Sequence, residues 1–147
     1  MRLINKILNF TNTLKIFTLT CLLIISACAK EIPSDQLVKK QGLYYEINTT
    51  TPFTGTKVSY HKNGNLSAKE NYKDGQLHGL SEEYYQSGQL SGLINYKDGP
   101  ENYILEVYYE SGQLKIKGYV KDGKHHGVWE TYYENGELEA IWDRTAN

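Results

Sequence analysis

Hydrophobic and polar residues alternate along short stretches of the chain, which are separated by pairs of turn-forming residues. In one stretch Leu66, Ala68 and Tyr72 alternate with polar residues, and the pattern recurs further along the chain. The stretches are rich in Tyr, Val, Ile and Thr, a composition typical of strands. A glycine-bearing turn roughly every 12 residues would interrupt helices. The pattern therefore predicts an all-β fold whose strands have one better-buried face.

The strands belong to a 24-residue unit that recurs four times without a gap, over residues 52–75, 76–99, 100–123 and 124–147. The ninth position is always tyrosine and the fifteenth always leucine, and we expect these residues to form the structural core. They are Tyr60, Tyr84, Tyr108 and Tyr132, with Leu66, Leu90, Leu114 and Leu138.

Two glycine-containing turns are predicted in each unit. The thirteenth position is always glycine, at Gly64, Gly88, Gly112 and Gly136, and follows Asn or Ser. Tight hairpins need positive φ at their central residues, which glycine adopts without strain. Asp74-Gly75, Asp98-Gly99 and Asp122-Gly123 supply the same chemistry at the other end of the unit. Each unit should then form two antiparallel strands.

The stretch GVWETYYENGEL, Gly127 to Leu138, fits the pattern G-x-W-x-x-Y-Y-x-N-G-x-L. It resembles the bacterial MORN repeat variant family, whose members are often labelled YwqK-type antitoxins, and the resemblance extends over all four units. It implies an elongated, single-layer antiparallel meander of β-hairpins. The third unit departs from the pattern: it opens with Pro100, and Tyr103 replaces the glycine of the other units. We expect a local kink or a recognition feature there.

Residues 1–27 contain three basic and no acidic residues and end in the apolar stretch Ile16–Ala27. This pattern predicts a secretory signal peptide, because 12 residues are too few to span a bilayer as a helix. Ile25–Cys28 resembles a bacterial lipobox, which implies that cleavage leaves Cys28 as the lipid-modified first residue. The alternatives are an uncleaved anchor and an ordinary signal peptide.

The lipobox resemblance also implies a location and an organisation. Acyl chains, at about 0.8 kcal/mol per buried CH₂, would anchor the protein at a membrane. Ala29 in place of aspartate implies outer-membrane sorting in a diderm bacterium. Residues 28–36 would form the lipidated cysteine and a tether. Residues 37–51 resemble half of a unit and are expected to cap the array.

Cysteine count and charge exclude several function classes. Cys21 lies in the predicted signal peptide and Cys28 would be acylated, so no thiol remains for a disulfide, a nucleophile or a metal. Without residues 1–27 the chain has 13 basic and 17 acidic residues, a net charge of about −4. This balance argues against binding to nucleic acid and against docking on anionic lipid headgroups.

The tyrosines are the main candidates for a binding surface. Successive residues in a strand point to opposite faces, so the ninth- and tenth-position tyrosines cannot share one core. Tyrosine is enriched at protein interfaces. The candidate binding strip comprises Tyr85, Tyr109 and Tyr133 with Tyr103. The alternative is that these large aromatics supply buried area to a thin sheet.

No catalytic or metal-binding set is recognisable. His78 and His126 share one position of the unit, but no cysteine or paired carboxylate stands at ligand spacing. Glu82, Glu106 and Glu130 are expected to form a solvent-facing stripe rather than an acid–base pair. The chain has no Ser-His-Asp set, no G-x-S-x-G motif and no phosphate loop. We therefore expect a non-enzyme without cofactor or metal.

These observations lead to one main hypothesis and two alternatives. The main hypothesis is a non-catalytic, membrane-anchored lipoprotein of the bacterial cell envelope, whose repeats form a scaffold that binds a protein partner. The first alternative is an antitoxin or immunity-type inhibitor of a toxin. The second is a structural spacer of the envelope.

Overall fold

The computed structural model describes residues 30–97 and 99–145, and within them it contains strands and one short 3₁₀-helix but no α-helix. The elements are β1 (Glu31–Pro33), η1 (Ser34–Gln36), β2 (Leu37–Lys40), β3 (Leu43–Glu46), β4 (Gly55–Tyr60), β5 (Leu66–Lys73), β6 (Gln76–Tyr84), β7 (Leu90–Tyr96), β8 (Tyr103–Tyr108), β9 (Leu114–Lys121), β10 (Lys124–Tyr132) and β11 (Leu138–Asp143).

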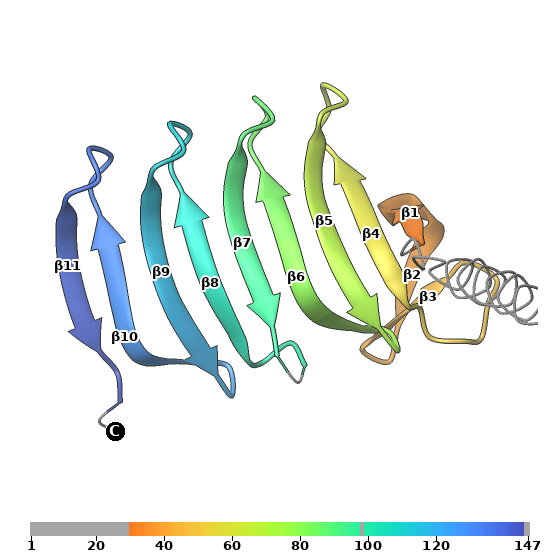
Figure 1. The fold of residues 1–147 in the computed structure, drawn as a ribbon. Helices are drawn as coiled ribbons and strands as arrows, with labels where there is room; N and C mark the ends of the chain where they lie inside the picture. Colours follow the sequence, from red (N-terminus) through yellow and green to blue (C-terminus); the bar gives the residue numbers. More distant parts are fainter. Residues whose placement is uncertain (1–29, 98, 146–147) are drawn as a thin grey trace, which may run out of the picture.

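Nine strands form one sheet in the order β1-β4-β5-β6-β7-β8-β9-β10-β11, and β2 and β3 form a separate hairpin. From β4 onward each strand pairs antiparallel with the next strand of the chain, whereas β1 lies parallel to β4. Figure 1 shows the strands side by side in one elongated layer. The predicted all-β meander of hairpins is confirmed.

The turns at the two ends of the strands differ. Asp74-Gly75 joins β5 to β6, with φ of 51° and 80°, and Asp122-Gly123 joins β9 to β10 with φ of 51° and 71°. Positive φ at both residues is the signature of a two-residue hairpin turn. At the opposite end of the strands, the thirteenth-position glycines lie in longer loops. All four have φ between 85° and 90°, and each N–H donates to the carbonyl three residues earlier.

The connection between the second and third units is not a two-residue turn. Tyr96 pairs with Tyr103, and the Lys97 N–H donates to the Asn102 carbonyl at 2.8 Å, so more than two residues connect β7 to β8. Pro100 has no N–H to contribute to the ladder at the position where the second and fourth units begin a strand. The tight-turn prediction for Asp98-Gly99 is therefore wrong, and Asp98 itself lies outside the described residues.

The expected kink in the third unit is also wrong, because the kinks occur in the second and fourth. Gly79 and Gly127 have φ of 72° and 69°, and the pairing register shifts beside each of them. Figure 1 shows β6 and β10 curving sharply near their first residues. Glycine permits this bulge at positive φ, whereas Tyr103 in the third unit pairs in register with Tyr96 and Val120.

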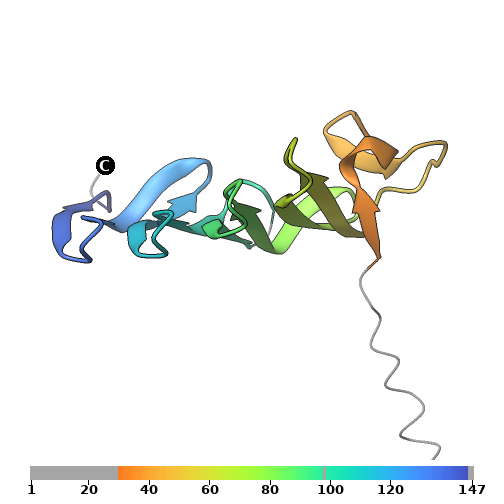
Figure 2. The ribbon, with the colours of Figure 1, turned by 90° about the horizontal axis from the view of Figure 1, so that it is seen from above.

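Residues 30–51, here called the cap, fold against the first unit rather than form a long tether. Glu31–Pro33 is strand β1, which pairs with Thr56–Val58 of β4. The predicted tether over residues 28–36 is therefore wrong from Glu31 onward. Figure 2, in which the sheet is seen nearly edge-on, shows the β2–β3 hairpin standing on one side of it.

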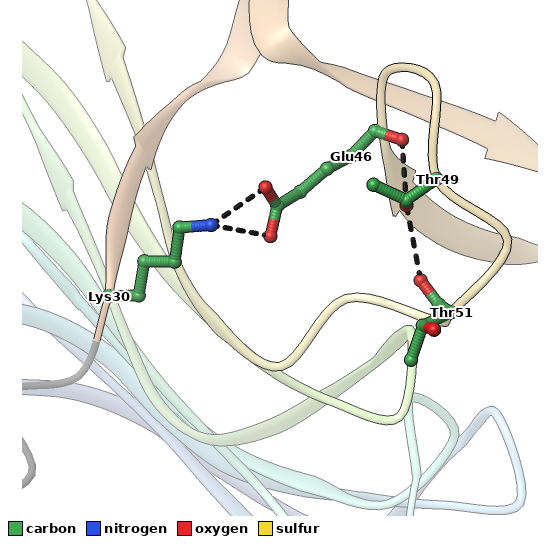
Figure 3. A network of polar contacts seen from close by, with 4 residues as sticks. All are labelled: Lys30, Glu46, Thr49 and Thr51. Atoms are coloured by element: carbon green, nitrogen blue, oxygen red, sulfur yellow. Dashed lines mark hydrogen bonds and ion pairs between the residues drawn. The ribbon is translucent and has the colours of Figure 1, made fainter.

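The cap is held to the sheet by a small hydrophobic core and by polar contacts. Phe53, Ile32 and Tyr72 are buried together, and the Tyr44 ring of the hairpin lies 4.8 Å from that of Tyr72. The Lys30 ammonium contacts both carboxylate oxygens of Glu46 at 2.7 and 2.8 Å (Figure 3). Hydrophobic burial is thus concentrated at the N-terminal end of the array.

Candidate binding face

The pairing register assigns side chains to two faces of the sheet. One face, here called the ladder face, carries the row Val58, Lys69, Glu82, Leu93, Glu106, Lys117, Glu130 and Ile141. The other, the cap face, carries Lys57, Glu70, Ser81, Ile94, Leu105, Gly118, Trp129 and Trp142. The β2–β3 hairpin of the cap covers this second face at the first unit, where the Lys57 ammonium lies 5.3 Å from the centre of the Tyr44 ring.

The ninth-position tyrosines lie on the ladder face beside the glutamates two residues earlier. Tyr84 donates to Glu82 at 2.9 Å and Tyr108 donates to Glu106 at 2.6 Å. In the fourth unit, Tyr132 donates to Glu130 in the same way. These tyrosines and glutamates are half-buried. The glutamate stripe is thus accompanied by a parallel row of tyrosines.

The core expectation fails at both ends of the array. Tyr60 is 60% exposed, because the first unit has Val58 where the others have a glutamate that would bind the hydroxyl. Leu138 on β11 is 49% exposed. The buried apolar side chains lie elsewhere, and they include Phe53, Val58, Tyr72, Val120 and Trp129. The remaining predicted core residues are half-buried: Tyr84, Tyr108 and Tyr132, with Leu66, Leu90 and Leu114.

The hydrogen bonds of the ladder face shift the protonation of their members. The bond to Glu106, followed by burial, raises the pKa of Tyr108 to about 12. The Lys117 ammonium, 2.7 Å from Glu130, and the Tyr132 hydroxyl hold the pKa of the Glu130 carboxyl below its usual range. The three glutamates of this row are thus engaged as hydrogen-bond acceptors.

The tenth-position side chains connect each unit to the next. The Tyr85 hydroxyl donates to the Tyr108 carbonyl at 2.7 Å, and the Tyr109 hydroxyl donates to the Tyr132 carbonyl at 2.9 Å. His61 holds the equivalent place in the first unit, with Nε2 2.7 Å from the Tyr84 carbonyl oxygen. These side chains therefore join adjacent units through their polar ends.

The predicted aromatic strip is not one continuous surface. Tyr133 is exposed, and within the described residues its hydroxyl makes no hydrogen bond. Tyr103 starts β8 and so lies at the opposite end of that strand from Tyr108, whose carbonyl receives the Tyr85 bond. Its ring packs 5.5 Å from that of Tyr96. Burial, followed by the neighbouring Tyr103, raises the pKa of Tyr96 to about 12. Tyr103 therefore belongs to an aromatic pair on the cap face.

An exposed apolar row on the ladder face was not foreseen. Its members occupy the fifth position of successive units: Leu80, Ile104 and Val128 are 44%, 52% and 51% exposed. Ile104 lines two adjoining hollows of about 650 and 180 Å³. The first is completed by Asn95, Lys97 and Tyr119, and the second by Leu80, Leu93, Asn95 and Glu106. Together they form a shallow groove across β6 to β9.

The sequence hides this row because the sixth position is often apolar as well. Leu105 follows Ile104 and Trp129 follows Val128, so alternation alone does not reveal which of the two is outside. The first unit differs at the fifth position, because Thr56 is buried and its hydroxyl donates to the Asn71 side chain. The fifth-position side chain is therefore exposed only from the second unit onward.

The histidines and carboxylates of residues 30–97 and 99–145 do not form a metal-binding cluster. No three His, Cys, Asp or Glu side chains of this part gather as they would around a metal ion. His126 instead packs edge-on against Tyr119, and His125 stacks on Trp129. In the same residues there is no helix of sufficient length and apolarity to cross a bilayer. Cys28 lies outside the described residues.

The repeat geometry agrees with a comparison against protein-family models. The MORN repeat variant model matches residues 53–74, 77–98, 104–122 and 126–143, more than half of the chain. The chain belongs to the MORN repeat variant family. The third match begins late in its unit, where Pro100 and Tyr103 depart from the repeat. The comparisons with curated proteins and with solved structures gave no match.

Proposed function

We propose that this MORN repeat variant protein is a non-catalytic scaffold that binds a protein partner across the apolar row of its ladder face. The observation that supports this most is the exposure of Leu80, Ile104 and Val128 at one position of three successive units. Contiguous exposed apolar surface on a soluble domain is a common feature of interaction sites. The two hollows beside Ile104 would accommodate side chains of the partner.

The spacing of the row defines the shape of the partner segment. Neighbouring strands lie about 4.8 Å apart, so equivalent residues of successive units are separated by about 9.6 Å. A polyproline II segment advances about 3.1 Å per residue with three residues per turn, so every third side chain lies on the same side at intervals of about 9.3 Å. A partner segment that crosses the strands with an apolar residue at every third position would match the row. Its basic side chains would lie near Glu82 and Glu106.

We further propose that the scaffold is anchored in a bacterial envelope by a lipid on Cys28, as the lipobox resemblance implies. The Lys30 carbonyl already accepts a hydrogen bond from Thr56 at 2.8 Å, and β1 begins at Glu31. Only two residues would then separate the lipidated cysteine from the folded array. The N-terminal end of the array would lie close to the membrane, with the later units extending away from the anchor.

Capture of a partner from envelope extract tests the proposed face. Residues 29–147 without lipid serve as bait, alongside the variant Ile104→Thr, which copies the residue of the first unit. The side chain is exposed, so the free energy of unfolding should change by no more than about 0.5 kcal/mol. We expect the variant to lose the partner that the parent protein captures.

The matched control is Ile47→Thr, because Ile47 is equally exposed but lies in the cap loop. This control should retain the partner. Equal capture by all three proteins would refute the ladder face as the binding site. A toxic captured protein would favour the inhibitor function, and the absence of any enriched protein would favour a structural spacer.

A further inference from the structure

A basic hollow lies where β9 turns into β10 and β11 ends. It has a volume of about 680 Å³ and is lined by Lys121, Asp122, Lys124, His125, His126 and Arg144. Two lysines and one arginine face a single aspartate, so these side chains carry a net charge of +2 with both histidines neutral. The predicted mature chain as a whole is acidic. Positive charge is therefore concentrated at this place.

Three separate features of the backbone assemble the hollow. The Asp122-Gly123 turn makes Lys121 and Lys124 direct cross-strand neighbours. The bulge at Gly127, with φ of 69°, bends β10 next to this turn. The Arg144 N–H donates to the Gly127 carbonyl at 2.9 Å, which brings the end of β11 to the bulge.

The same fold element occurs two units earlier without the charge. The hollow beside the Asp74-Gly75 turn measures about 270 Å³ and is lined by Lys73, Asp74, Gln76, Leu77, His78 and Gly99. Gln76 and Leu77 hold the places of Lys124 and His125. Its side chains carry one positive and one negative charge, so the turn and the bulge form without a cationic cluster. The basic residues of the later hollow are thus not explained by the requirements of the fold.

In the described part of the chain, the three cations of the hollow are not held in ion pairs, while Asp122 lines the hollow and Asp143 interacts with His126. Within the described residues, Lys121, Lys124 and Arg144 make no ion pair with a carboxylate within 4.0 Å. Asp143, beside the hollow in sequence, accepts hydrogen bonds from the N–H and the hydroxyl of Thr145. Like charges facing each other across a strand pair are unfavourable. An anion in the hollow would relieve this repulsion.

We propose that this hollow, the Lys121–Arg144 site, binds a phosphate dianion carried by a ligand outside this chain. Arginine offers a planar fork of donors and lysine offers point charges, both of which suit phosphate oxygens. A dianion matches the net charge of +2, whereas a carboxylate would leave one charge uncompensated. The His125 ring, held 4.0 Å from the Trp129 ring by stacking, provides a further donor at the rim.

The test uses the soluble repeat protein and inorganic phosphate at pH 8, where phosphate is mainly dianionic. Binding is followed residue by residue through backbone amide NMR shifts. We expect saturable shifts around the Asp122-Gly123 turn, with much smaller shifts around Asp74-Gly75. The double variant Lys124→Gln/His125→Leu copies the neutral hollow and should weaken binding about tenfold. Lys73→Gln in the neutral hollow should leave the affinity unchanged.

Vesicles distinguish the two sources of the phosphate group. Phosphatidylcholine vesicles with and without phosphatidic acid are sedimented with the same proteins. Cosedimentation that requires phosphatidic acid and Lys124 would identify a lipid headgroup, and phosphate binding without cosedimentation would identify a soluble or polymer-borne ester. Equal shifts at both turns, or undiminished affinity in the double variant, would overturn the site. Neither result bears on the ladder-face proposal, because Ile104 lies outside this hollow.

Discussion

The indole ring of Trp129 on β10 packs directly against the backbone of Gly118 on β9. A Cβ atom at residue 118 would overlap the indole carbons Cδ2, Cε2 and Cε3. Trp129 is only 3% exposed, and its Nε1 donates to the Tyr119 carbonyl at 3.1 Å, so the ring is fixed in place. The absence of a side chain at Gly118 therefore permits the largest buried residue of the fourth unit.

This contact predicts that Gly118→Ala is destabilising although the glycine lies in a strand. Alanine normally suits a strand better than glycine, but here the indole must move, and overpacking costs about 1–3 kcal/mol. Gly92→Ala is the matched control, since an added Cβ there would meet its nearest atom at 3.5 Å. Urea unfolding should show a loss of about 2 kcal/mol for Gly118→Ala and no loss for Gly92→Ala. Equal stability of the two variants would contradict the packing argument.

The repeat period made the hairpin sequence predictable, because turn chemistry and strand composition recur at fixed positions. The differences between units were harder to foresee. Gly79 and Tyr103 occupy the same position of the unit, yet the glycine lies at a bulge and the tyrosine pairs in register. Local patterns indicate where a strand lies, but they do not indicate how its neighbour accommodates a bulge.

The loop glycines predict a second difference between substitutions. Gly88 has φ of 90°, but an added Cβ would meet no atom within 4 Å. The cost of Gly88→Val is therefore conformational and should reach about 1–2 kcal/mol or more, since a β-branched residue resists the left-handed region. Gln89→Val, at the next and exposed position, should cost far less. Thermal unfolding followed by circular dichroism compares the two, and similar midpoints would refute the turn assignment.

The hydrogen bonds between units predict a third pair of variants. Tyr109→Phe removes the bond from the Tyr109 hydroxyl to the Tyr132 carbonyl, which should cost about 1 kcal/mol. Tyr133→Phe removes an exposed hydroxyl without a partner in the described residues and should be neutral within about 0.5 kcal/mol. Chemical unfolding measures both values. A loss in Tyr133→Phe as large as in Tyr109→Phe would contradict this role of the tenth position.

These tyrosines also explain why the candidate site was only partly predictable. The alternation of side chains in a strand separates the ninth-position tyrosines from the tenth-position tyrosines. It does not show which backbone carbonyl of the next unit accepts a hydrogen bond from each hydroxyl. The Tyr85 hydroxyl donates to the Tyr108 carbonyl at 2.7 Å, and this bond joins the second unit to the third. The exposed apolar row was missed for a related reason: Ile104 and Leu105 are equally apolar, and only the pairing register places Ile104 outside.

The raised pKa of Tyr108 predicts a loss of stability in alkali. The hydrogen bond to Glu106, followed by burial, raises this pKa to about 12, whereas an unfolded tyrosine titrates near 10. The folded state thus favours the neutral phenol. Its contribution to stability is fully present below about pH 10 and is lost as the pH rises toward 12.

Tyr108→Phe should therefore reduce the decrease in the free energy of unfolding between pH 9 and pH 11.5. Urea titrations at the two pH values measure this decrease. Tyr60→Phe is the control, because Tyr60 is 60% exposed and lacks a glutamate two residues earlier. Lysines that also titrate in this range contribute equally to parent and variants, so the difference isolates the phenol. If Tyr108→Phe loses as much stability in alkali as the parent and Tyr60→Phe, the bond between Tyr108 and Glu106 does not couple protonation to folding.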